Sequence, residues 1–279
     1  MTEPRSLFLD VEGYEIHVTE WGPTNGPVLV MWHGLARTGR DFDSLARHFR
    51  SAYRIVCPDT IGRGLSSWSR QPDADYVIPR YGELAERLLD RLGIGDCHWI
   101  GTSMGGLIGM TVAAGAAGGR IGRLVVNDIG PRINPAALAR IRSYVTQLPA
   151  FATLRELEAL LRQVYRPFGR LSDAEWRAMA ETSARRRDDG QWTLHYDPAV
   201  MRVFAAQPDD GHLWAEWDRI SCPTLVLRGE ESDVLLPEVA EEMTRRGPRA
   251  LLVTVPGCGH APALNVSDQI AVIEAFLEG

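Results

Sequence analysis

The chain has 279 residues, enough for one large domain or for one domain that carries a sizeable insertion. Its composition, 45% hydrophobic and 24% charged, is ordinary for a globular protein, and its net charge of −6 argues against nucleic-acid binding. No apolar run approaches the roughly 20 residues that span a bilayer, and no secretory signal is visible at the N-terminus. We therefore expect a cytoplasmic protein without a nucleic-acid or membrane partner; its oligomeric state stays open.

The predicted strands change character along the chain. Residues 7–11 and 14–21 alternate around a turn at Glu12-Gly13, as an antiparallel pair does. Later strands are continuous apolar runs, which indicate burial on both faces of a parallel sheet, at residues 28–32, 54–57, 98–100, 124–126, 224–227 and 251–255. Amphipathic stretches between them predict helices at residues 41–49, 81–92, 104–117, 238–246 and 268–277. This alternation predicts an α/β fold with a doubly wound, mostly parallel sheet of about eight strands.

One long insertion interrupts the alternation after the sixth strand. It contains only helical periods and loops, with helices expected at residues 135–147, 153–165, 172–187 and 198–206. It would lie at the carboxyl ends of the strands, where open α/β sheets bind ligands. We therefore expect a core of residues 1–131 and 211–279 and a helical cap at residues 132–210. Most of the cap's aromatic residues should pack its own interior: Phe151, Tyr165, Phe168, Trp176, Trp192, Tyr196 and Phe204.

The four cysteines are far apart and form no C-x-x-C pair: Cys57, Cys97, Cys222 and Cys258. Such spacing favours small buried side chains in a reducing compartment over metal ligands or disulfides. We expect no metal site.

The segment Gly101-Thr102-Ser103-Met104-Gly105 has the G-x-S-x-G spacing of a nucleophile elbow. It directly follows a predicted strand and directly precedes a predicted helix, which is the context that the motif requires. A sharp turn forces the serine into a strained conformation, so the residues two before and two after it must lack side chains. The turn also places Ser103 at a helix N-terminus, where free N–H groups favour a developing negative charge.

A serine nucleophile needs a base, and the base needs an orienting acid. His260 follows the last predicted strand, so it should lie in a loop at the same sheet edge as Ser103. We expect structural or solvated roles for His17, His48, His98, His195 and His212.

Two aspartates are candidates for the acid. Asp233 lies between Ser103 and His260 in the sequence and follows the strand at residues 224–227. Asp128 directly ends the strand at residues 124–126, at the same sheet edge. The sequence favours Asp233, with Asp128 as the alternative; Glu230 and Glu231 are expected to be solvated.

The oxyanion donors are expected from two strand ends. Gly34 lets the backbone turn so that the N–H of Leu35 points toward the serine, and the N–H of Met104 is the second donor. His33 is expected to brace this loop.

Together these residues resemble the α/β-hydrolase superfamily, specifically its capped, single-domain members. Residues 59–66 look like the family's D-x-x-G-x-G-x-S turn, and residues 229–237 look like its G-x-x-x-D-x-x-x-P acid loop. The resemblance implies an α/β-hydrolase fold, a triad of Ser103, Asp233 and His260, and no cofactor.

Departures from the family patterns narrow the expected reaction. Haloalkane dehalogenases and epoxide hydrolases of this fold carry an aspartate where Ser103 stands. Carbon–carbon bond hydrolases often share Ser-Met-Gly-Gly but usually have a tryptophan after the histidine, where Ala261 stands here. Proline iminopeptidases typically have a tryptophan in the place of Met104. We expect a carboxylesterase that acts on a small to medium, partly hydrophobic ester. The alternatives are an enol-lactone hydrolase, a carbon–carbon bond hydrolase of a diketone ring-fission product and, remotely, a non-catalytic ligand receptor.

Overall fold

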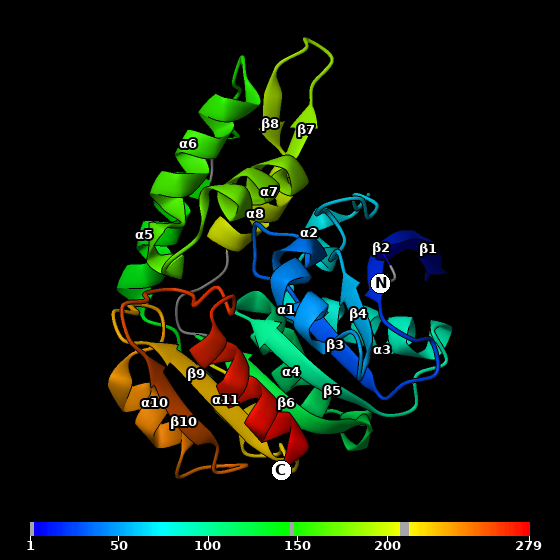
Figure 1. The fold of residues 1–279 in the computed structure, drawn as a ribbon, viewed down its shortest axis with the longest axis vertical. Helices are drawn as coiled ribbons and strands as arrows, with labels where there is room; N and C mark the ends of the chain where they lie inside the picture. Colours follow the sequence, from blue (N-terminus) through cyan, green and yellow to red (C-terminus); the bar gives the residue numbers. More distant parts are fainter. Residues whose placement is uncertain (1–2, 146–147, 207–211) are drawn as a thin grey trace.

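A central sheet organises the molecule in the computed structural model, which describes residues 3–145, 148–206 and 212–279 (Figure 1). Within the described residues the sheet has eight strands in the order β1-β2-β4-β3-β5-β6-β9-β10. The strands are β1 (Arg5–Val11), β2 (Tyr14–Trp21), β3 (Val28–Trp32), β4 (Arg54–Pro58), β5 (Cys97–Thr102), β6 (Ile121–Asn127), β9 (Thr224–Gly229) and β10 (Leu251–Val255). β2 pairs antiparallel with both β1 and β4, and the pairs from β4 to β10 are parallel. The predicted doubly wound α/β sheet is confirmed.

Helices cover both faces of this sheet because its parallel strands carry apolar side chains on both sides. In β3, Val30 and Trp32 join one buried cluster, whereas Leu29 and Met31 join the other. The first cluster packs against α3 (Ile78–Arg91), α4 (Met104–Ala114) and α10 (Pro237–Met243). The second packs against α1 (Asp43–Phe49) and α11 (Ser267–Glu278). Short α2 (Pro72–Asp75), α9 (Trp214–Trp217), η1 (Gly39–Phe42) and η2 (Gly118–Arg120) lie in the connections.

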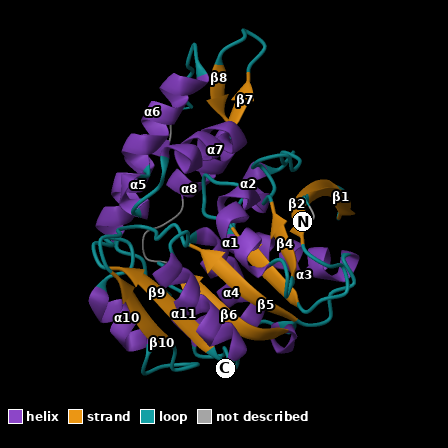
Figure 2. Ribbon diagram, in the orientation of Figure 1, coloured by secondary structure: helices purple, strands orange, loops and turns teal. Residues whose placement is uncertain are grey.

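A second group of elements lies beyond the carboxyl ends of the parallel strands, which are the arrowheads in Figures 1 and 2. It contains α5 (Pro135–Val145), α6 (Leu154–Val164), η3 (Arg166–Phe168), α7 (Asp173–Ser183), β7 (Ala184–Arg186), β8 (Trp192–Leu194) and α8 (Pro198–Ala206), and we call it the helical layer. α6 and α7 each begin with a capping box, formed by Thr153 with Glu156 and by Ser172 with Glu175.

One prediction in this layer is wrong. The helix expected at residues 172–187 ends at Ser183, and Ala184–Arg186 pairs with Trp192–Leu194 as a small antiparallel hairpin. The guanidinium of Arg186 lies 4.8 Å from the ring of Trp192, a contact that stabilises the hairpin. The expected helix end at residue 147 and the expected cap boundary at residues 210 and 211 lie outside the described residues.

The four cysteines are free; three are buried and Cys222 is partly buried. In the part of the chain that the structure describes, no helix has the length and apolarity to cross a membrane.

Candidate active site

Ser103 lies in the turn between β5 and α4 with a φ of 52° and a ψ of −115°, a strained conformation for a residue with a side chain. The two flanking glycines make this turn possible. A Cβ on Gly101 would lie 2.2 Å from the carbonyl oxygen of Gly105, and a Cβ on Gly105 would lie 2.0 Å from the carbonyl oxygen of Trp32. The structure therefore has the expected strand–turn–helix geometry.

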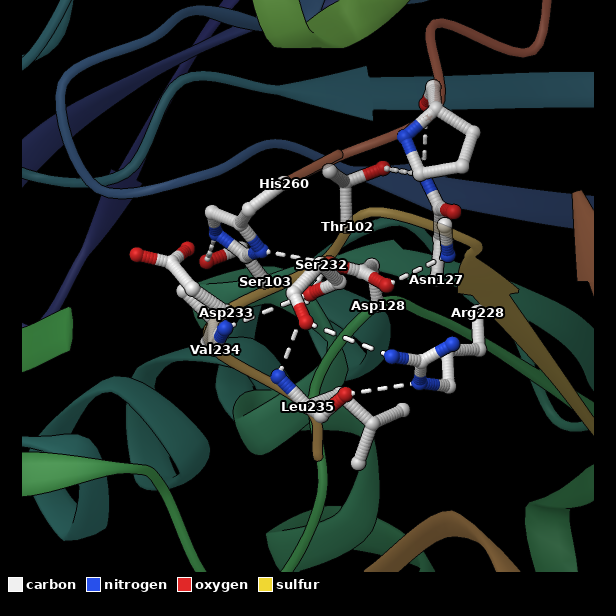
Figure 3. A network of polar contacts seen from close by, with 12 residues as sticks. Thr102, Ser103, Asn127, Asp128, Arg228, Ser232, Asp233, Val234, Leu235 and His260 are labelled. Carbon is white, nitrogen blue, oxygen red and sulfur yellow. Dashed lines mark hydrogen bonds and ion pairs between the residues drawn. The ribbon is translucent and has the colours of Figure 1, made fainter. Parts of the chain in front are cut away.

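His260 joins this serine to a buried carboxylate (Figure 3). Its Nε2 lies 2.9 Å from Ser103 Oγ, and its Nδ1 lies 2.8 Å from Asp128 Oδ2. Asp128 directly follows β6 and is fully buried. Two more donors hold its carboxylate: the Gly229 N–H at 2.7 Å and the Ser232 hydroxyl at 2.6 Å. These bonds fix the orientation of the carboxylate toward the imidazole.

The structure contradicts the preference for Asp233 as the partner of His260. The carboxylate of Asp233 bonds the guanidinium of Arg140 on α5, at 2.6 and 2.8 Å, and 44% of each side chain is exposed. The loop after β9 is held by Arg228, which donates to the carbonyls of Leu235 and Ser232 at 2.8 and 3.3 Å. In this loop it is Ser232 whose side chain reaches the sheet edge, so Asp233 faces α5 instead.

Leu35 and Met104, the two expected oxyanion donors, lie beside Ser103. Both line the same cavity as Ser103, and a Cβ on Gly34 would lie 3.7 Å from Ser103 Cβ, so the loop passes close to the serine. Met104 is the first residue of α4, where an N–H has no carbonyl one turn earlier in the helix. Within the described residues, neither N–H donates a hydrogen bond to another protein group.

His33 fixes the orientation of the Leu35 N–H. The N–H of Thr60 donates to His33 Nε2 at 2.9 Å, so the proton sits on Nδ1, which donates to the Gly34 carbonyl at 2.7 Å. Burial lowers the pKa of His33 to about 4, which keeps the ring neutral. In a trans peptide the carbonyl and the next N–H point in opposite directions, so this bond turns the Leu35 N–H away from His33. The expected bracing role is confirmed.

The comparison with protein-family models matches residues 29–275 to the alpha/beta hydrolase family. The chain belongs to this family. It is 40% identical to the 3-hydroxybutyrate-oligomer hydrolase of Cupriavidus necator over 270 residues, which is 93% of this chain and 92% of that protein. Among solved structures, an alpha/beta hydrolase from Novosphingobium aromaticivorans has a TM-score of 0.88 and 33% identity, with 100% and 99% of the two chains covered. A hydrolase from Rickettsia typhi has a TM-score of 0.91 and 27% identity, with 99% of both chains covered.

The cavity of this hydrolase has a volume of about 360 Å³ and lies between the carboxyl ends of the strands and the helical layer. Its floor includes Ser103 and His260, and its far wall includes Leu138, Tyr165, Phe168 and Phe204 from the helical layer. Of the seven aromatic residues expected to pack the cap, four do not line the cavity and are buried or partly buried instead: Phe151, Trp176, Trp192 and Tyr196.

Several polar residues that line the cavity were not predicted from the sequence. Arg37, Arg140 and Arg142 line the cavity, together with Tyr76 and Tyr81. Arg37 pairs with Asp41 four residues later. An i, i+4 spacing of opposite charges was the available signal for this pair, but it also describes many exposed pairs on helix surfaces.

Proposed function

We propose that this protein is a serine esterase that hydrolyses short oligoesters of a hydroxy acid through an acyl-enzyme on Ser103. The observation that carries the proposal is the chain of hydrogen bonds from Ser103 to His260 to Asp128, at 2.9 and 2.8 Å. A hydroxyl, an imidazole and a buried carboxylate in this order are the parts that nucleophilic acyl transfer requires.

The mechanism follows from the positions of these groups. Ser103 Oγ attacks the ester carbonyl while His260 Nε2 takes its proton, and Asp128 stabilises the imidazolium that forms. The N–H groups of Leu35 and Met104 bind the oxyanion, and losing one such donor costs about 3 kcal/mol of transition-state stabilisation. His260 then protonates the leaving alcohol. It next activates a water molecule, which releases the acid and restores Ser103.

The substrate class rests on the relative and on the cavity walls. The relative from Cupriavidus necator, 40% identical, is named for the hydrolysis of 3-hydroxybutyrate oligomers. Such oligomers combine methyl-bearing ester units with one terminal carboxylate. Apolar residues with Arg37, Arg140 and Arg142 in the same wall suit both parts of this molecule. We include in the proposal that residues 132–210 act as the cap that selects the substrate.

The test is hydrolysis of the 3-hydroxybutyrate dimer and trimer, measured as release of the monomer by the wild type, by Ser103→Ala and by the control Ser51→Ala. Ser51 is an exposed residue between α1 and β4. We expect Ser103→Ala to lose activity by at least about 10⁴-fold and Ser51→Ala to keep it. Undiminished turnover by Ser103→Ala would contradict the mechanism.

The same machinery can open a lactone or cleave a carbon–carbon bond, so an enol lactone and a vinylogous diketone belong in the substrate panel. Faster turnover of either one than of the oligoesters would replace the proposed substrate and leave the Ser103 mechanism in place. Covalent labelling of Ser103 by a fluorophosphonate separates an enzyme from an inert ligand receptor.

A further inference from the structure

Arg63 is a fully buried arginine in the loop after β4, directly behind the loop that carries Leu35. Its Nε donates to the carbonyl of Leu35 at 2.9 Å. Its Nη1 donates to the carbonyl of Ile61 at 2.8 Å and to the hydroxyl of Tyr81 at 2.6 Å. Its Nη2 contacts Sδ of Met104 at 3.4 Å. One guanidinium therefore contacts both proposed oxyanion donors, Leu35 and Met104.

The charge of Arg63 has no carboxylate partner within the described part of the chain. Two carboxylates in its neighbourhood are engaged elsewhere: Asp59 pairs with His17 at 2.8 Å, and Asp197 accepts from the hydroxyl of Tyr76 at 2.7 Å. Carbonyl oxygens and the rings of Tyr76 and Tyr81, at 5.7 and 5.0 Å, surround the guanidinium instead. Burying a cation without a counter-ion is costly, so a turn with a purely structural role has little reason to contain one.

Two side chains bond the two backbone carbonyls that flank the Leu35 Cα. His33 bonds the carbonyl before the Leu35 N–H, and Arg63 bonds the carbonyl after it. Fixing both carbonyls restricts the backbone rotation of Leu35 and so fixes the direction of its N–H. A donor fixed in advance needs no reorganisation when negative charge develops on the substrate oxygen.

We propose that Arg63 is a positioning residue for the oxyanion hole and that its unpaired charge is complemented only when the oxyanion forms. The inference rests on the proposed acyl transfer at Ser103. An interaction that strengthens only in the transition state raises kcat and leaves ground-state binding unchanged. Arg63 should therefore affect kcat much more than KM.

The experiment compares Arg63→Met, which removes the charge at similar length, with Arg63→Lys, which keeps the charge but lacks the fork of donors. Turnover of p-nitrophenyl butyrate gives kcat and KM. Titration with phenylboronic acid, which forms an anionic tetrahedral adduct on a serine, reports on the oxyanion hole without turnover. We expect Arg63→Met to lower kcat at least tenfold, which corresponds to about 1.4 kcal/mol, with KM within threefold of the wild type. Boronate affinity should fall by a similar factor, and Arg63→Lys should recover part of both losses.

Arg54→Met is the matched control for loss of a partly buried arginine. Arg54 is the first residue of β4, at the amino ends of the parallel strands, whereas the site lies at their carboxyl ends. Its side chain pairs with Glu20 at 2.6 Å. We expect it to lower the melting temperature without changing kcat.

Three outcomes would overturn the inference: a folded Arg63→Met with kcat and boronate affinity within threefold of the wild type, a loss that appears only in KM, or an Arg63→Lys with wild-type kcat. If Arg63→Met does not fold, Arg63→Lys decides alone. Failure of the proposed function is recognised separately, because the wild type would then bind the boronate no better than Ser103→Ala does.

Discussion

Asp128 combines full burial with a positive φ of 55°, and its carboxylate oxygens accept from the Gly229 N–H and the Ser232 hydroxyl as well as contacting His260. Asp233 has none of these properties and is paired with Arg140 near the surface. The two carboxylates therefore have different roles, and conservative substitutions can separate them.

We expect Asp128→Asn to lower kcat by about 10³- to 10⁴-fold, because an amide in that place neither stabilises the imidazolium nor holds its tautomer. Asp233→Asn is the matched variant and should keep kcat within about threefold. Steady-state kinetics on the same ester measures both. A larger loss of kcat for Asp233→Asn than for Asp128→Asn would show that Asp233, in the loop after β9, is the acid that supports His260.

His33 should make stability depend on pH. Burial lowers its pKa from 6.5 to about 4, so between pH 6.5 and pH 4 the unfolded chain binds more protons than the native protein. The free energy of unfolding therefore falls as the pH falls through this window, by roughly 3 kcal/mol for the full shift. Above pH 6.5 this contribution is fully present.

Urea unfolding at pH 7.5 and pH 4.5 tests this on the wild type and on His33→Gln, which does not titrate. We expect the variant to have a lower free energy of unfolding than the wild type at pH 7.5. The difference between the two free energies should be smaller at pH 4.5. Burial also lowers the pKa values of His98 and His195, but both proteins share those contributions. An equal difference in the free energy of unfolding at both pH values would show that the pKa of His33 is not lowered by burial.

Ser103 and His260 could be predicted at the residue scale because the flanking strand and helix patterns fix where they lie. The aspartate that bonds His260 could not, because Asp128 and Asp233 both follow strands whose carboxyl ends lie at the same side of the sheet. The path of one loop decides between them: it turns Ser232 toward the edge and Asp233 toward Arg140. That path depends on the bonds of Arg228, a residue whose pattern in the sequence gives no such information.

At the scale of elements, the contact between β3 and the start of α4 fixes the elbow. Gly105 packs against the backbone of Trp32, which cannot move without disturbing the centre of the sheet. We expect Gly105→Ala to reduce the free energy of unfolding by more than about 2 kcal/mol and to abolish activity.

Gly95→Ala is the control for this prediction, since a Cβ there meets no atom within 4 Å. Thermal melting and ester turnover of the two variants check it. Equal effects would mean that the close approach at Gly105 is relieved by local adjustment.

The sheet was predictable because apolar runs bounded by turns report burial on both faces. The hairpin of β7 and β8 was not, because its strands have three residues each and the first continues the helical pattern of α7. Local pairing and the stacking of Arg186 on Trp192 stabilise it, together with the stacking of Arg185 on Trp68, a contact between distant parts of the chain.

At the scale of the whole molecule, the ion pair of Arg140 and Asp233 joins the helical layer to the sheet's loops. Each side chain is 44% exposed, so water and salt screen the attraction. We expect a double-mutant cycle on the free energy of unfolding, with Arg140→Ala and Asp233→Ala, to give a coupling energy below about 1 kcal/mol. A coupling above 2 kcal/mol would show that the pair is shielded from solvent.

The position of Asp128 has a consequence for how such an enzyme can diversify. Under the proposed mechanism, the residue that contacts the helical layer, Asp233, is not one that contacts the histidine. Lineages could therefore exchange the inserted segment for another, together with its anchoring aspartate, and keep the proton-transfer chain unaltered. New substrate preferences would then arise by grafting, at little risk to the chemistry.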